Sequence, residues 1–412
     1  MDTVPFYGKA DEKYLMDDFT HFPTIEEVVR EYASGRGTKT AIALLFMLGM
    51  SLMESCLDPY TAPASLSRLN YLVVEGFLNN ETVPTLIRLS RSIPLGSGNK
   101  PVPESNAIVE IEDDQGRSFV LAETDLGSYS RLPLTIGPDR NYRLKIRTSS
   151  NKRYESDFVP FRPTPVIDSV NLAVDGQDVH IYTNTHDDNN STHYYLWKYE
   201  ETWAYTSAYQ SQFKFENGQV ILRDDDIYHC WKTLPSTQIL ISSSTKLAQD
   251  IISNYTLVTL PLNSERFQSE YSMIVKQFAL TKEAFEYWQE LKKNTENIGT
   301  IFGPQPSQTF SNIHCISNPE EPVIGYFSAS SIEQKRVFIF RRDLPIVRNI
   351  TGYESCEKDT LFLSEIPDFR GTELLSTAIS SGATLIGYYK SSYNCVDCRF
   401  HGGTTVKPDF WK

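Results

Sequence analysis

Several short stretches of this chain alternate apolar and polar residues, and this period of two constrains the fold most. Residues 142–147 (YRLKIR) alternate at every position, and residues 85–90 (TLIRLS) and 107–112 (AIVEIE) carry similar alternations. Successive side chains of a β-strand point to opposite faces, so each stretch predicts a strand with one buried face. The turn at 113–116 (DDQG) predicts a hairpin. High aromatic content, 12%, together with 22 Pro and 21 Gly, favours an exported, mainly β protein.

The strand signals form two series. We interpret residues 69–159 as a first β-sandwich, because a continuous apolar strand at 71–76 precedes the alternating stretches. Three prolines within 158–165 (FVPFRPTP) predict a domain boundary. A second β-rich, sandwich-like domain follows over 164–412, and it ends in a cysteine-rich tail.

One helix is predicted inside the second domain, over residues 281–297. Thr281 can cap its first turn, and Gly299 supplies a stop signal. An apolar stripe recurs at helical spacing, which is more typical of a core face than of a binding site. The stripe consists of Ala284, Phe285, Trp288 and Leu291.

An apolar run over residues 40–56 (TAIALLFMLGMSLMESC) has the plan of a lipoprotein signal peptide. Arg36 and Lys39 precede it, and the small residue Ser55 stands before Cys56. The run is too short to span a bilayer. We therefore predict a signal peptide over 37–55 and a lipid on Cys56. The alternative is a buried core helix.

The segments before and after the predicted signal peptide are expected to have different roles. Residues 1–36 contain a short amphipathic helix pattern, and we interpret them as an extraneous segment from an early start codon or a fusion; an unusually long basic region is the alternative. Residues 56–68 are rich in Pro, Ser and Ala and form a tether.

Six cysteines are present, and an exported protein meets an oxidising compartment. With Cys56 lipidated, five remain. We predict a disulfide between Cys356 and either Cys395 or Cys398, because the tail has little apolar surface to stabilise it. Cys230 is the candidate partner of the remaining sulfur. The strand-like surroundings of Cys315 suggest a free, buried thiol.

Two other readings of the tail stay open at this point. Cys356, Cys395, Cys398 and His401 have enough ligands and a suitable CxxC spacing for zinc. A redox-active CxxC would normally begin a helix in an α/β fold, whereas two glycines follow here.

Catalytic and nucleic-acid motifs are absent from the sequence. It contains no GxSxG elbow, no HExxH, no GxGxxG after a strand and no P-loop. The formal net charge is −13, with no basic run, which argues against nucleic-acid binding. We therefore predict a protein that is not an enzyme and that has no cofactor, no metal and no nucleic-acid partner.

Two tripeptides match the Asp-Ser/Thr-apolar pattern of bacterial O-glycosylation. They place candidate glycans on Ser169 (168–170, DSV) and Thr360 (359–361, DTL). Unmodified surface strands are the alternative, because three-residue matches arise by chance.

Several motifs resemble those of the Bacteroidota lipoprotein family known as domain of unknown function 4249. The tail motifs, residues 395–399 (CVDCR) and 407–411 (KPDFW), are the most specific, and 71–78 (YLVVEGFL), 272–294 and 303–308 (GPQPSQ) also match. The resemblance implies an outer-membrane lipoprotein with an N-terminal immunoglobulin-like sandwich. Such proteins are encoded near TonB-dependent receptors, and the family supplies no catalytic residues.

Three functions are then in view, and the weakest is a hydrolase with a dispersed site, which would need convergent carboxylates or a Ser-His pair in a cleft. The first is a binding or accessory lipoprotein that acts with a TonB-dependent receptor, held on the periplasmic or outer face of the outer membrane. The second is a structural or adhesive surface lipoprotein without small-molecule cargo. A concave, aromatic-lined cleft would favour the first.

Overall fold

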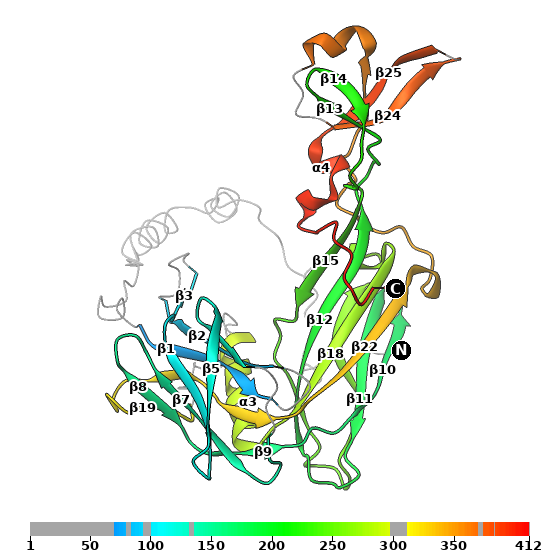
Figure 1. Ribbon diagram of the computed structural model, residues 1–412. Coiled ribbons are helices and arrows are strands. Elements are labelled where there is room, and N and C mark those ends of the chain that lie inside the picture. Colours follow the sequence, from blue (N-terminus) through cyan, green and yellow to red (C-terminus); the bar gives the residue numbers. More distant parts are fainter. Residues whose placement is uncertain are drawn as a thin grey trace, which may run out of the picture. The chain divides into compact units, whose positions relative to one another are not determined.

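The structure is a computed structural model that describes residues 70–79, 84–93, 100–131, 136–296, 311–369, 374–382 and 384–411. Residues 68–412 form one compact unit. The segments predicted as extraneous, signal peptide and tether, with Cys56, lie outside the described residues, as does the 303–308 loop. The fold is mainly β, as predicted (Figure 1).

Twelve strands, which form one continuous hydrogen-bonded sheet that folds around the first core, make up the unit that we call the first sandwich. They are β1 (Leu72–Leu78), β2 (Thr85–Arg91), β3 (Val102–Pro103), β4 (Ile108–Asp113), β5 (Ser118–Asp125), β6 (Ser128–Arg131), β7 (Asn141–Arg147), β8 (Arg153–Ser156), β9 (Val159–Arg162), β19 (Ile313–Cys315), β20 (Val323–Gly325) and β21 (Ser328–Ser330).

Two sets of strands enclose the core of this sandwich. β5 joins them at one side by pairing with β4 and β6, and β9 joins them at the other by pairing with β7 and β21. The alternating residues Leu144 and Ile146 of β7 face inward, where they meet Ile87 and Leu89 of β2. Period-two patterning therefore places one face of each strand in the core.

Strands from beyond the boundary predicted at 158–165 join the first sandwich. β19, β20 and β21 come from the second half of the chain, yet they pair with β8 and β1, and β21 also with β9. Val323, Phe327 and Ala329 are buried in the first core. The close parallel pairing of β20 with β1 depends on Gly325, where φ is 138° and a Cβ would lie 2.2 Å from the Val74 carbonyl oxygen.

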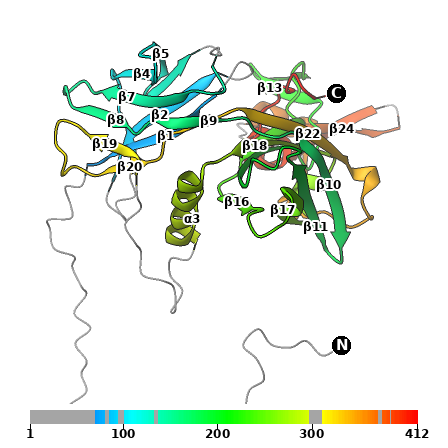
Figure 2. The ribbon, with the colours of Figure 1, turned by 90° about the horizontal axis from the view of Figure 1, so that it is seen from below.

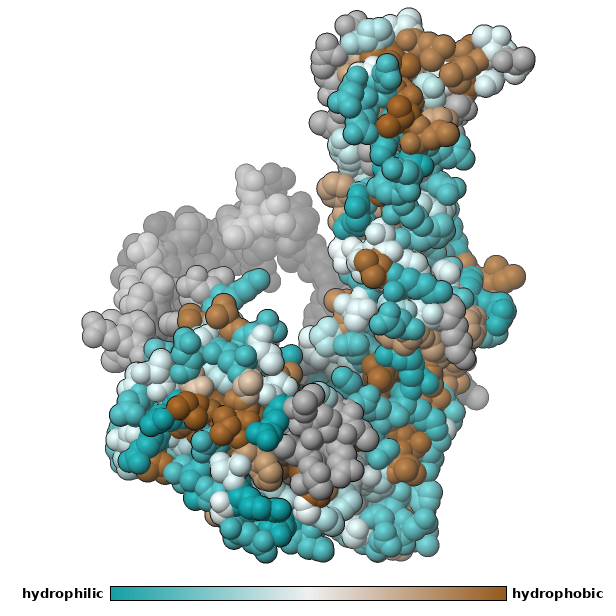
Figure 3. All heavy atoms as spheres, viewed as in Figure 1, coloured by the Kyte–Doolittle hydropathy of each residue, from teal (hydrophilic) through white to brown (hydrophobic). Residues whose placement is uncertain are grey.

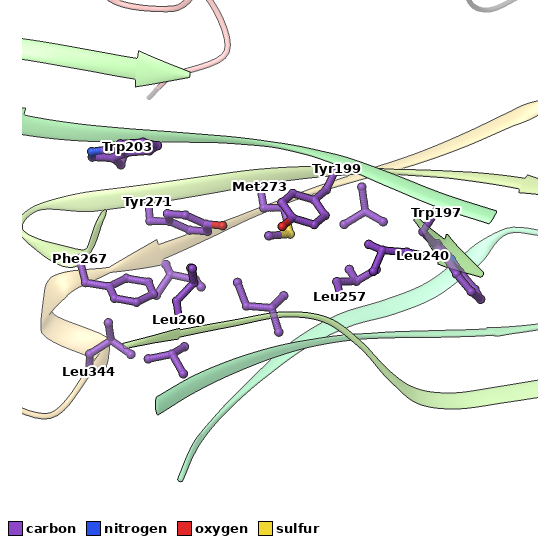
Figure 4. Packing of buried hydrophobic residues seen from close by; sticks show 14 of the residues in the cluster. Trp197, Tyr199, Trp203, Leu240, Leu257, Leu260, Phe267, Tyr271, Met273 and Leu344 are labelled. Atoms are coloured by element: carbon purple, nitrogen blue, oxygen red, sulfur yellow. The ribbon is translucent and has the colours of Figure 1, made fainter. Parts of the chain in front are cut away.

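Two further sheets enclose the second core (Figure 4). One contains β10 (Ile167–Asp175), β11 (Asp178–His186) and β17 (Ile251–Pro261); the other contains β15 (His229–Pro235), β12 (Tyr194–Thr206), β18 (Glu270–Ala279), β22 (Ile332–Phe340) and β16 (Leu240–Ser243). Trp197 and Trp203 of β12 lie on the inner face with Met273 of β18.

The predicted helix is present as α3 (Lys282–Glu296), seen side-on in Figure 2. The Thr281 hydroxyl accepts a hydrogen bond from the Ala284 backbone N–H at 3.2 Å, which is the expected cap. Ala284, Phe285 and Trp288 pack against the outer face of the five-stranded sheet, so the stripe is a core face.

A smaller distal segment is built from two pieces of chain. It contains β13 (Phe213–Glu216), β14 (Gln219–Leu222), β23 (Asp359–Phe362), β24 (Leu374–Ser381) and β25 (Thr384–Ser391). Short helices are η3 (Glu265–Phe267), η4 (Arg341–Asp343), η5 (Leu363–Asp368), α4 (Tyr393–Val396) and η6 (Cys398–His401). Phe213 and Phe215 of the hairpin pack against Tyr388 and Phe369.

Candidate functional site

Two disulfides fasten the tail. Cys356 is bonded to Cys395 with a Cα–Cα distance of 5.7 Å, and Cys230 is bonded to Cys398 at 5.9 Å. The predicted disulfides are therefore present, and Cys315 is a free, buried thiol. Backbone hydrogen bonds join the same parts of the chain, since Cys398 N–H donates to the Ile227 carbonyl oxygen at 2.9 Å.

The zinc alternative for the tail is wrong. The sulfurs of Cys356, Cys395 and Cys398 are consumed by disulfides, so they cannot serve as thiolate ligands. His401 instead packs its ring against Tyr353 at 4.2 Å. Among the described residues, no group of three or more potential metal ligands converges.

The end of the chain docks through two aromatic residues. Trp411 is 7% exposed and donates its indole N–H to Glu270 Oε2 at 2.8 Å. The Phe410 ring lies under the Arg336 guanidinium, 3.5 Å from its carbon. Val406 of the same tail is 72% exposed and does not contribute.

A cavity of about 590 Å³ opens at one end of the first sandwich. Its lining comes from the first described residues of the chain, from the ends of β2 and β3, from the turn between β7 and β8, and from the segment before β20. Its lining consists of Asn70, Tyr71, Arg91, Val102, Pro103, Glu104, Ser149, Ser150, Lys152, Asn318, Glu320, Glu321 and Pro322.

Charged side chains hold one another in this cavity. Arg91 Nε donates to Glu104 Oε2 at 2.5 Å, and its Nη1 lies 3.8 Å from Glu321 Oε1. Glu321 also accepts from Lys152 Nζ at 2.5 Å and from the Tyr154 hydroxyl at 2.7 Å. Glu321 lies just before β20, in the segment that returns to the first sandwich from the second half of the chain. This segment therefore supplies the acid that interacts with both Arg91 and Lys152.

Burial and pairing oppose each other in the pKa values of this network. Burial alone would raise the pKa of Glu321, but hydrogen bonds from Lys152 and Tyr154 outweigh it and lower that pKa. Burial, reinforced by the bond to Glu321, raises the pKa of Tyr154. The acid therefore stays ionised and the phenol neutral at physiological pH.

The cavity suits a polar ligand. Hydroxyl and amide groups of Ser149, Asn70 and Asn318 stand beside the paired charges, and Tyr71 is the aromatic residue of the lining. This cavity is therefore not the aromatic-lined cleft that the sequence analysis named as favouring cargo binding. Sequence reasoning missed the site, because its residues come from five separate parts of the chain.

The two candidate glycosylation residues lie on strands. Ser169 is half-buried on β10, and its Oγ accepts from the side-chain amides of Asn171 and Asn184, each at 3.0 Å. Thr360 is half-buried on β23. Glycosylation at either position stays a prediction.

None of the helices in the described part of the chain has the length and apolar character to cross a membrane.

The model of a protein family, described as "Domain of unknown function (DUF4249)", matches residues 58–336. The chain belongs to this family. In this DUF4249 protein the matched range includes the first sandwich with β19–β21 and the second sandwich as far as the middle of β22, and it ends before the cysteine-rich tail. No curated protein matches the chain.

One solved structure similar to this DUF4249 protein is a proposed carbohydrate binding protein from Bacteroides uniformis. The identity is 10%, and the similarity covers 51% of this chain and 90% of the other. The TM-score is 0.15. At that score the ligand of the other protein is not carried over to this one.

Proposed function

We propose that this DUF4249 protein is an exported binding lipoprotein, anchored to the outer membrane through Cys56, that acts with a TonB-dependent receptor and has no enzymatic activity. The two disulfides support an oxidising compartment. The observation that carries the binding role is the charged cavity, which begins at Asn70 and Tyr71, directly after the tether.

The tether limits where the cavity can work. Thirteen residues lie between Cys56 and Asn70, so an extended tether spans at most about 50 Å. A lipid on Cys56 would keep the cavity within that reach of the membrane, close enough for a receptor in the same membrane. We include the immunoglobulin-like description of residues 69–159 in this proposal, with β19–β21 as additions to that module.

Cell fractionation and affinity purification test the proposal together. Tagged wild-type protein is expected in the outer-membrane fraction and should recover a TonB-dependent receptor, whereas Cys56→Ala should appear in the soluble fraction. A Cys230→Ser/Cys398→Ser protein controls for general misfolding, since its anchor is intact. Membrane association unchanged in Cys56→Ala, or recovery of no receptor, would contradict the proposal.

A second function, adhesion without small cargo, draws support from the distal segment. Leu222 is 72% exposed, Phe362 49% and Leu363 41%, and Figure 3 shows apolar residues gathered at this part of the molecule. Exposed apolar surface marks interaction sites. If Leu222→Ser/Phe362→Ser abolishes cell-surface attachment while receptor recovery is unchanged, adhesion is the better description.

A further inference from the structure

The charged residues that line the cavity are already paired with one another. Among the described residues its charges come from two bases, Arg91 and Lys152, and from the acids Glu104, Glu320 and Glu321. Arg91 is bonded to Glu104, and Lys152 is bonded to Glu321. A charged ligand would have to separate one of these pairs, and a partly buried charge that loses its partner is costly. An uncharged ligand leaves both pairs intact.

Ion pairs alone do not identify a ligand site in this protein. Arg143 of β7 is bonded to Glu112 and Glu155 across neighbouring strands, and none of these three residues lines the cavity. The network around Arg91 differs because it lies in a cavity of about 590 Å³. The argument for a ligand therefore depends on the other groups that share this lining.

Side-chain exposure separates an inner part of the cavity from its rim. The side chains of Arg91, Glu104 and Glu321 are 12%, 12% and 9% exposed, whereas that of Lys152 is 43% exposed. The rim also carries exposed residues with uncharged amide or hydroxyl groups, which are Asn70, Ser149, Ser150 and Asn318. A ligand that enters would therefore meet neutral donors and acceptors first and the paired charges after them.

The paired groups keep hydrogen-bonding capacity for such a ligand. Within the described structure Glu321 accepts from Lys152 and from the Tyr154 hydroxyl, and a carboxylate has further lone pairs beyond these two. Arg91 donates from Nε to Glu104, and the guanidinium fork has other N–H groups that can bond to adjacent hydroxyls. Hydroxyl groups, which both donate and accept, suit this mixture.

Hydrogen bonds to the backbone hold the walls of the cavity in place without a ligand. The Glu104 N–H donates to the Leu89 carbonyl oxygen at 2.9 Å, and the Tyr129 hydroxyl donates to the Glu104 carbonyl oxygen at 2.8 Å. The Thr148 N–H donates to the Lys152 carbonyl oxygen at 3.0 Å, which closes the β7–β8 turn. A preformed site loses little conformational entropy on binding, which matters for a ligand held by neutral hydrogen bonds.

The lining also offers a small apolar surface. It comes from Tyr71, Val102 and Pro103, at the start of β1 and on β3. A sugar ring presents hydroxyl groups at its edge and C–H groups on its faces, so it needs polar and apolar contacts together. Amphipathic aromatic rings such as that of Tyr71 supply the apolar contact.

We propose that the cavity takes an uncharged, polyhydroxylated ligand, namely a neutral sugar. This inference rests on the binding role proposed above and specifies its ligand class. The hydroxyl groups would bond to Asn70 and Asn318 at the rim and to the paired charges within. A uronic acid would be repelled by the cavity's carboxylates and an amino sugar by Arg91 and Lys152, so specificity comes from rejection of charge as well as from attraction.

Ligand-observed NMR titration of the full chain tests the ligand class with matched probes. These are glucose, galactose and mannose, each compared with its uronate and its amino sugar at slightly acidic pH, where the counterparts are charged. At least one neutral hexose should bind more tightly than both of its charged counterparts. Asn70→Ala and Asn318→Ala should each weaken this binding roughly three- to tenfold, because a hydrogen bond is lost. Asn189→Ala, at an exposed turn outside the cavity, should leave affinity unchanged.

Glu104→Gln tests the charge pairing separately. The amide keeps the shape of the side chain but leaves Arg91 with less compensation of its charge. The variant should therefore gain roughly fivefold in affinity for the uronate, the size of one ion-pair contribution, while its affinity for the neutral hexose changes less. Thermal unfolding of each variant shows whether it is folded at the temperature of the titration.

The proposal is overturned if no neutral hexose binds, if a charged counterpart binds as tightly as its neutral parent, or if Asn70→Ala and Asn318→Ala both keep wild-type affinity. A folded Glu104→Gln protein without any gain for the uronate would also overturn it. These outcomes are distinct from failure of the proposed function, which is read from receptor recovery. Tagged protein that recovers the receptor but binds no hexose would keep the accessory role and lose only this ligand class.

Discussion

At the residue scale, Asp113 shows how one buried carboxylate organises a turn. Its side chain is fully buried and accepts hydrogen bonds from the backbone N–H groups of Gln115 and Arg117. Arg117 Nε and Arg140 Nη1 donate to its second oxygen at 2.7 and 3.0 Å. Burial alone would raise the pKa of Asp113, but these partners outweigh it and hold the pKa below its ordinary value.

Asp113→Asn is expected to lower the free energy of unfolding by about 2–3 kcal/mol at neutral pH, because paired guanidinium groups lose their counter-ion. A depressed carboxyl pKa gives stability that is present above the unfolded-state pKa and is lost as the pH falls through the folded-state value. The variant should therefore lose less stability than the wild type on acidification. Urea unfolding at several pH values measures both effects; parallel curves would contradict the role of this charge.

The pKa of Glu265 is shifted in the opposite direction from that of Asp113. Burial raises its pKa, which Lys232, His401 and Arg266 only partly oppose, and its Oε1 is buried with no hydrogen-bond partner in the described structure. A raised carboxyl pKa removes stability as the pH rises through the folded-state value.

Glu265→Gln should therefore raise the free energy of unfolding at pH 7 by roughly 0.5–1 kcal/mol, since it removes a partly desolvated charge. The gain should shrink toward acidic pH, where the wild-type carboxyl is protonated. Urea unfolding at pH 7 and at acidic pH provides the measurement. A variant that is less stable than the wild type at pH 7 would show that the charge is needed.

At the element scale, the two disulfides hold the tail and the distal segment to the second sandwich. They close very different loops, because the sequence separation is 168 residues for Cys230–Cys398 and 39 for Cys356–Cys395. Longer loops lose more chain entropy on closure, so the bridges are not equivalent.

Replacing both cysteines of a bridge by serine should cost about 5 kcal/mol for Cys230–Cys398 and about 4 kcal/mol for Cys356–Cys395 in the chain-entropy treatment. The measurement is urea unfolding of the two variants, compared by the urea concentration at which each is half unfolded. Reduction of the wild type provides a matched control, since it removes both bridges without substitution. A reversed order would indicate that local packing, not loop length, decides their contributions.

At the scale of the whole molecule, the first sandwich is completed by a segment more than 150 residues later in the chain. Phe327 is 1% exposed in its core, and Asn312 exchanges two hydrogen bonds with the Phe327 backbone. Residues 69–159 thus contain most of this sandwich but not all of its core.

A fragment of residues 68–165 is therefore expected to lack cooperative thermal unfolding, because its core is open where β20 and β21 pair with β1. The same fragment joined through a flexible linker to residues 311–331 should fold. Circular dichroism melting and the dispersion of amide NMR signals compare them. Cooperative unfolding of the shorter fragment would show that the returning strands are only an addition.

Local patterns in the sequence were sufficient for several individual elements. Alternation in 142–147 predicted β7, and the capping Thr281 with its apolar stripe predicted α3 within a residue at each end. These signals depend only on the period of side chains along one element. The sequence also predicted that Cys356 and Cys230 pair with the two cysteines of the CxxC, but the structure alone decided which sulfur each one takes.

Only the tertiary structure decided which distant elements pair and in what register. The return of β19–β21 to the first sandwich and the charged cavity both depend on such pairing. A strand's periodicity states which face is buried but not which strand lies beside it. Partner and register are selected by the summed packing of the whole core, a quantity that no local stretch of sequence contains.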